Sequence, residues 1–132
     1  MIRYLLDTNH AGLLFREPDT SVWVHIAQLS RKQCGLCWPS IGELWFMVEN
    51  SAQKEMNRRK LASLIPQFSI WRYEHDEARE FGRLRVELRA QGTPIPMVDV
   101  MIAATARANN LVVVTADQHF NLITGLKVEN WM

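Results

Sequence analysis

Four acidic residues have a chemistry and placement suited to a shared site, because each follows an apolar run or lies near the expected start of a helix. They are Asp7, Glu43, Asp99 and Asp117. Carboxylates in one site raise one another's pKa and are costly to bury, and a divalent cation relieves both effects. Oxygen donors without His or Cys favour Mg²⁺ or Mn²⁺ over zinc. Such an ion activates water for attack on phosphorus, so the four acids together predict a phosphoryl-transfer site.

Each of these acids also has a structural explanation. Asp7 is placed to cap a helix, Asp99 lies at the positive end of one, and Asp117 is placed to close a turn. Ser40 and Glu43 match the capping-box pattern, in which the helix begins at Ser40 and Glu43 bonds back to its first residue. The chemical interpretation therefore depends on all four acids meeting.

Apolar runs separated by helical patterns predict the α/β class. Strands are expected in segments 2–6, 33–38, 68–73, 111–115 and 127–131, with helical spacing between them, including 52–65, 74–90 and 97–108. Continuous apolar strands are typical of a mainly parallel sheet covered by helices on both faces. The crossover rule brings the carboxyl ends of the first and fourth strands to one edge, where such folds place their functional crevice.

Length and composition bound the class of protein. The chain has 132 residues, 48% of them hydrophobic and 22% charged, which predicts one domain over residues 1–132. No apolar run approaches the roughly 18 to 20 residues that span a bilayer, so we expect no membrane segment and a cytoplasmic location. The formal net charge of +1 excludes nucleic-acid binding by bulk electrostatics. A local basic patch is needed instead, and its candidates are Arg16, Lys54, Arg58, Arg59 and Lys60.

The two cysteines invite a metal or redox interpretation that their context opposes. Cys34 and Cys37 form a CGLC segment within an expected strand. Residues three apart in a strand point to opposite faces, so the two sulfurs should not meet. A structural zinc site also needs a second ligand pair that the chain does not offer. Buried free thiols are the expectation.

At this point the sequence resembles a known family over essentially its whole length. The motifs that carry the resemblance are LLDTN, SIGEL from Ser40, IPMVDVMIAATA, VVVTADQHF and the closing VENW. In this order they are similar to the PIN domain, specifically to VapC-type toxin ribonucleases. The resemblance implies a three-layer α/β/α sandwich and an Mg²⁺- or Mn²⁺-dependent endoribonuclease that cleaves RNA. It also implies a homodimer and a cognate small antitoxin protein as partner.

The resemblance also assigns roles to the four acids. Asp7, Glu43 and Asp99 match the family's three acidic site residues, and Asp117 matches a fourth position. On physical grounds we expect Asp7 and Asp99 to be direct metal ligands and Asp117 a direct or water-mediated one. Glu43 is expected to hold or deprotonate a metal-bound water.

Two further polar residues are candidates for supporting roles, and two positions depart from the family pattern. Thr115 fits the hydroxyl residue of the family's TxD turn, and Asn9 is placed to orient Asp7 or a phosphate. Pro96 stands where relatives commonly have Gly, and Thr105 where a His often follows IAA. All four acids are present, so neither departure predicts an inactive enzyme.

Aromatic residues suggest where an antitoxin would bind. Five tryptophans are many for this length, and most are expected in the core. We expect a few aromatic residues to line a groove for an antitoxin segment. The candidates are Phe15, Trp23, Trp45 and Phe46.

Two alternatives to the ribonuclease remain open. One is a catalytically silent PIN-like module that binds protein or RNA. The other is an enzyme with an aspartyl-phosphate intermediate on Asp7. It is disfavoured because the second acid expected two residues later is Asn9.

Overall fold

Five short apolar strands form one parallel sheet in the computed structural model, which describes residues 1–17 and 20–132 apart from the side chain of Phe15. The strands are β1 (Tyr4–Leu6), β2 (Cys34–Cys37), β3 (Ser69–Trp71), β4 (Val112–Val114) and β5 (Lys127–Glu129). Their order in the sheet is β3-β2-β1-β4-β5. The chain therefore reverses its direction of growth between β1 and β4, the kind of switch point at which parallel sheets open a crevice.

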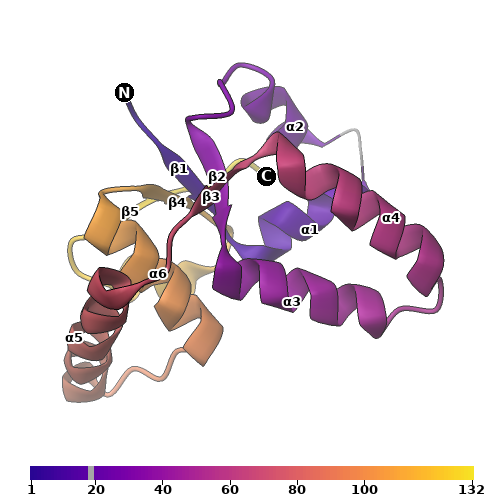
Figure 1. Cartoon of the computed structure of the whole chain (residues 1–132). Helices are drawn as coiled ribbons and strands as arrows, with labels where there is room; N and C mark the ends of the chain where they lie inside the picture. Colours follow the sequence, from indigo (N-terminus) through magenta and orange to yellow (C-terminus); the bar gives the residue numbers. More distant parts are fainter. Residues whose placement is uncertain (18–19) are drawn as a thin grey trace.

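Helices cover both faces of the sheet, as the sequence predicts (Figure 1). One layer contains α1 (Thr8–Arg16), α2 (Ser21–Ile26), α3 (Trp38–Glu49) and α4 (Lys54–Leu64). The other contains α5 (His75–Gln91) and α6 (Met97–Asn109). Two 3₁₀ turns, η1 (Ile65–Gln67) and η2 (Gln118–Leu122), complete the chain. No described helix is long and apolar enough to cross a membrane.

Successive strand residues supply the two hydrophobic cores. Leu6 and Val114 belong to the core under α1, α3 and α4, whereas Leu5 and Val113 belong to the core under α5 and α6. Cys34 and Cys37 divide in the same way and are both free and buried. Burial raises the pKa of the Cys34 thiol to about 12 and also raises that of Cys37. The prediction of two buried free thiols on opposite faces is confirmed.

Gly35 is required where β3 reaches across β2 to β1. The indole Nε1 of Trp71 donates a hydrogen bond to the Tyr4 carbonyl oxygen at 2.9 Å. A Cβ atom on residue 35 would lie 2.6 Å from both that nitrogen and the Ser69 carbonyl oxygen. Any larger residue would therefore push Trp71 out of its place.

The start of α3 differs from its prediction. The N-cap is Cys37 rather than Ser40, and Ser40 occupies the third helical position, where it completes a capping box with Cys37. The helix tolerates Pro39 here because the first turn needs no intrahelical donor. Glu43 thus lies in the second turn and has no capping role, which leaves its carboxylate available for other chemistry.

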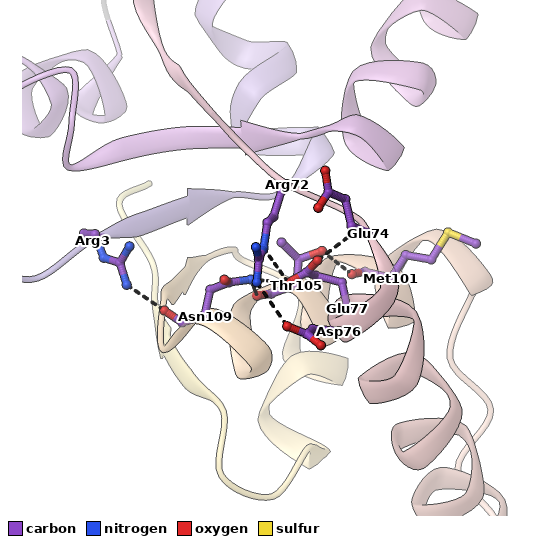
Figure 2. A network of polar contacts seen from close by, with 8 residues as sticks. All are labelled: Arg3, Arg72, Glu74, Asp76, Glu77, Met101, Thr105 and Asn109. Atoms are coloured by element: carbon purple, nitrogen blue, oxygen red, sulfur yellow. Dashed lines mark hydrogen bonds and ion pairs between the residues drawn. The ribbon is translucent and has the colours of Figure 1, made fainter.

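A buried carboxylate joins α5, α6 and the turn after β3 (Figure 2). Glu77 is fully buried, and it accepts hydrogen bonds from the Glu74 backbone N–H at 2.8 Å and the Asn109 amide at 3.0 Å. Arg72 approaches the same carboxylate at 3.3 Å. Burial raises the pKa of Glu77, but these hydrogen bonds and the Arg72 charge more than offset it, so the pKa lies below its ordinary value. The Asn109 carbonyl oxygen in turn accepts from Arg3, which ties the network to the start of β1.

Candidate active site

Asp7 follows β1 directly and is held by groups from two elements. As the N-cap of α1, its Oδ1 accepts the His10 backbone N–H at 2.8 Å. Its Oδ2 accepts the Thr115 hydroxyl at 2.6 Å. The residue is only 4% exposed, so its carboxylate is fixed inside the switch point of the sheet. The capping explanation and the site explanation are therefore compatible.

Thr115 links the ends of β1 and β4. It is buried just beyond β4, and its hydroxyl donates to Asp7 while accepting the Asp117 backbone N–H at 2.9 Å. Asp117 caps the η2 turn through the His119 backbone N–H at 2.9 Å. One hydroxyl therefore sets the spacing of the two acids that follow β1 and β4.

Asp99 interacts electrostatically with the other three acids. Asp99 lies in the first turn of α6 and is half-buried. Its pKa is raised to about 6, first by burial and then by the negative charges of Asp117, Asp7 and Glu43. Asp99 therefore lies within electrostatic range of three acids from other segments, and their assembly into one metal site stays a prediction.

The donor set fits a hard divalent cation in its chemistry. Its members are carboxylates, and their mutual repulsion, visible in the raised pKa of Asp99, is what a bound cation would relieve. Within residues 1–17 and 20–132, no three His, Cys, Asp or Glu side chains lie close enough together to hold an ion as they stand. Binding would therefore require side-chain adjustment, for which the half-buried Glu43, Asp99 and Asp117 have more room than Asp7.

Comparison with known proteins agrees with this geometry. The model of the PIN domain matches residues 4–126. The chain belongs to the PIN domain family.

Related proteins, including one of known crystal structure, match this PIN domain over essentially its full length. It is 29% identical to Ribonuclease VapC2 of Haemophilus influenzae, with 100% of both chains covered. It is also 29% identical to the tRNA(fMet)-specific endonuclease VapC of Shigella flexneri, with 99% of both covered. The crystal structure of VapBC2 from Rickettsia felis, bound to a DNA fragment from their promoter, superposes with a TM-score of 0.93 at 29% identity over 100% of both chains.

Two histidines contact the acids of this PIN domain, and the sequence patterns did not single them out. The His10 ring lies 3.2 Å from Asp7 Oδ1, and His119 Nδ1 lies 2.9 Å from Asp117 Oδ1. The charge of His119 also lowers the pKa of Asp99. The available signal was position, since each follows its acid by two or three residues at a helix start. Asn9 is exposed, and its supporting role stays a prediction.

Two separate hollows divide the aromatic residues proposed for one groove. A hollow of about 480 Å³ between α1, α2 and α4 contains Trp23. Another, of about 450 Å³, is lined by Glu43 and Phe46 with parts of α3 and α6. Trp45 packs against the core. Trp23 and Phe46 thus line different hollows, and the contribution of these aromatic residues to antitoxin binding stays a prediction. The side chain of Phe15 lies outside the described part of the chain.

Of the five basic candidates, three line the Trp23 hollow, Arg58 forms ion pairs, and Lys54 lines a separate hollow at the start of α4. Arg16, Arg59 and Lys60 line the hollow. Arg58 instead forms ion pairs with Glu49, at 2.7 Å, and with Glu55. We expect these ion pairs to neutralise most of the Arg58 charge.

The raised pKa of Asp99 predicts a stability gain on its neutralisation. Because its folded pKa of about 6 lies above the ordinary 3.8, the folded state binds the proton more tightly, and stability falls as the pH rises from about 4 to 6. Asp99→Asn has no carboxyl group to ionise and so avoids this loss of stability. In EDTA at pH 7.5 it should be more stable than wild type by about 1 kcal/mol, a value that allows for solvent screening of the partly exposed side chain. Urea unfolding at pH 7.5 and pH 4 measures the effect.

The gain should vanish at pH 4, where wild-type Asp99 is also neutral in the folded state. Asp76→Asn, which changes an exposed acid on α5, is the control and should show no such pH-dependent gain. Equal stability of Asp99→Asn and wild type at both pH values would contradict the electrostatic origin of the shift.

Proposed function

We propose that this PIN domain is a metal-dependent endoribonuclease of the VapC type that acts as the toxin of a toxin–antitoxin pair. The observation that carries the proposal is the convergence of four acids at the β1–β4 switch point, expressed in the raised pKa of Asp99. Full-length similarity to proteins named as a ribonuclease and an endonuclease supports the same reaction.

The chain offers specific residues for each part of the reaction. Asp7 and Asp99 would hold Mg²⁺ or Mn²⁺ directly, and Asp117 would hold it directly or through water. When bound, the cation supplies charge neutralisation at the phosphate and activation of water. Thr115 keeps Asp7 and Asp117 at a constant spacing through its two hydrogen bonds.

Glu43 is the residue that we propose accepts a proton during hydrolysis. It has no capping role in α3, it is half-buried, and it lines an open hollow beside Asp99's neighbour Val98. A carboxylate in this setting takes the proton of the attacking water as the phosphodiester bond breaks.

RNA must approach an acidic pocket on a nearly neutral protein, so positive charge is needed near the pocket. The candidates for RNA binding are Arg16, Arg59 and Lys60, which line the Trp23 hollow. The relative from Shigella flexneri is named for tRNA(fMet), which makes a structured tRNA the first substrate to try.

The decisive experiment is cleavage of a structured RNA pool, with a tRNA fraction included, by purified protein free of antitoxin. We expect cleavage with Mg²⁺ or Mn²⁺ and none with EDTA. Calorimetry with Mn²⁺ should detect binding in parallel. Failure of both cleavage and metal binding would overturn the proposal in favour of a catalytically silent binding module.

We also propose a small antitoxin as partner, in line with the VapBC2 structure that the chain matches, and a homodimer, which the resemblance to VapC-type proteins implies. The Trp23 hollow is the candidate antitoxin site, since its floor is apolar, with Leu14 and Leu64, and its rim is basic. An antitoxin segment with an apolar anchor and acidic neighbours fits both features.

Trp23→Ala should weaken antitoxin binding by about 30-fold, the scale of an interfacial aromatic anchor. Because Trp23 also packs on Phe68, the exposed Arg59→Glu variant tests the same site without removing core contacts and should weaken binding as well. Val86→Ala, which changes an exposed side chain on α5, is the control. Calorimetry with the purified antitoxin measures all three, and unchanged affinity in both hollow variants would place the antitoxin elsewhere.

A further inference from the structure

His10 is a fully buried histidine whose ring makes one polar contact among the described residues. It lies in the first turn of α1, and its Nδ1 is 3.2 Å from Asp7 Oδ1. Its Nε2 is buried and has no hydrogen-bond partner in the part of the chain that the structure describes. The ring is therefore oriented toward the Asp7 carboxylate alone.

This contact bears on which nitrogen of the imidazole carries a proton. A carboxylate oxygen only accepts hydrogen bonds, so the 3.2 Å contact is a hydrogen bond when Nδ1 carries the proton. We propose that His10 is a positioning residue for the metal ligand Asp7, with its Nδ1–H donating to Oδ1. This inference rests on the proposed function, because it assigns a purpose to the contact within the metal site.

The hydrogen bonds around Asp7 leave one acceptor position open. Oδ1 receives two donors from His10, the backbone N–H at 2.8 Å and the ring at 3.2 Å. Oδ2 receives the Thr115 hydroxyl at 2.6 Å. Since each carboxylate oxygen has two lone pairs, Oδ1 is filled and Oδ2 retains one. Asp7 thus offers a cation one oxygen, which suits Mg²⁺ and Mn²⁺ better than the two-oxygen chelation common for Ca²⁺.

A purely structural role does not account for the imidazole. The His10 backbone N–H already satisfies the helix cap, so the ring adds nothing to that function. A buried ring nitrogen without a partner costs stability that an aliphatic side chain would avoid. Hydrogen-bonded groups behind a metal ligand, in contrast, fix the orientation of the ligand.

Two substitutions separate the donor from the space it fills. His10→Leu removes the donor and keeps an apolar side chain in the pocket. His10→Asn keeps an N–H donor at the same distance from the backbone. Leu61→Ala, a buried change in the core that also packs on α1, serves as a control for loss of stability alone.

Calorimetric titration of metal-free protein with Mn²⁺ is the first readout. We expect His10→Leu to lose about 10-fold or more in Mn²⁺ affinity, the scale found for groups that orient metal ligands. His10→Asn should recover most of it, and Leu61→Ala should bind like wild type. Ca²⁺ should compete better in His10→Leu than in wild type, because Oδ1 then regains one lone pair while the backbone N–H of residue 10 still occupies the other.

The ¹⁵N NMR spectrum of the His10 ring in metal-free wild type is the second readout. A protonated Nδ1 supports the proposal, and a bare Nδ1 overturns it. Equal Mn²⁺ affinity of wild type, His10→Leu and His10→Asn would also overturn it while leaving the proposed function intact. Absence of Mn²⁺ binding to wild type overturns both, and the NMR result then still reports whether the contact exists.

Discussion

Asp7→Asn is expected to reduce RNA cleavage about 1,000-fold, since the loss of several kcal/mol of transition-state stabilisation by the metal site corresponds to about three orders of magnitude. Asn is a good N-cap and has the shape of Asp, so it can still accept the His10 N–H that Asp7 accepts at 2.8 Å. The variant should therefore fold, and the lost activity should report the lost charge. Initial rates of cleavage at saturating Mg²⁺ measure the effect.

The matched control is Asp76→Asn, which removes an exposed acid on α5 that pairs with Arg72. It should cleave at the wild-type rate. Asp99→Asn should lose activity like Asp7→Asn although it gains stability in EDTA, a combination that a merely unfolded variant cannot produce. Retention of more than a third of wild-type activity by Asp7→Asn would show that Asp7 does not hold the metal.

Glu77→Ala is expected to destabilise the protein by about 3 kcal/mol, or about 10 °C in Tm for a domain of this size. Glu77 is fully buried, and its removal leaves the Glu74 N–H, the Asn109 amide and the Arg72 guanidinium without their acceptor (Figure 2). Thermal and urea unfolding at pH 7 measure the loss.

The pH dependence of this loss has a defined sign. The folded pKa of Glu77 lies below its ordinary value, so its contribution is present above the ordinary pKa of glutamate, about 4.3, and is lost as the pH falls through the folded value. The difference between wild type and Glu77→Ala should therefore narrow in acid. Asp76→Ala removes the exposed partner of the same Arg72 and should cost less than about 1 kcal/mol. Equal losses in the two variants would assign the effect to Arg72 rather than to the buried carboxylate.

The sequence by itself determined the strands, the class of fold and the identity of the candidate ligands. Continuous apolar runs encode buried parallel strands locally, and an acid placed directly after such a run must emerge at the carboxyl edge of the sheet. Asp7 and Asp117 were located in this way. The location of Cys34 and Cys37 on opposite faces of the sheet followed from the two-residue period of a strand. This period can be read from the strand alone, without knowing which elements pack against it.

Only the tertiary structure decided which side chains touch. The sequence predicted a helix that begins at Ser40, whereas in the structure the helix begins after Cys37, which ends a buried strand and whose backbone N–H donates to Ser40 Oγ. The contact of Thr115 with Asp7 joins residues 108 positions apart, and the pairing of Arg58 with Glu49 joins two helices.

The aromatic residues and His10 follow the same logic. Trp23 and Phe46 share an aromatic character but line different hollows, because the packing of α1, α2 and α4 directs one and that of α3 and α6 the other. The ring of His10 contacts Asp7 only through the rotamer that the surrounding core permits. Local sequence patterns specify helices, strands and helix caps. Contacts between distant side chains depend instead on strand order and packing, which no short segment of the sequence determines.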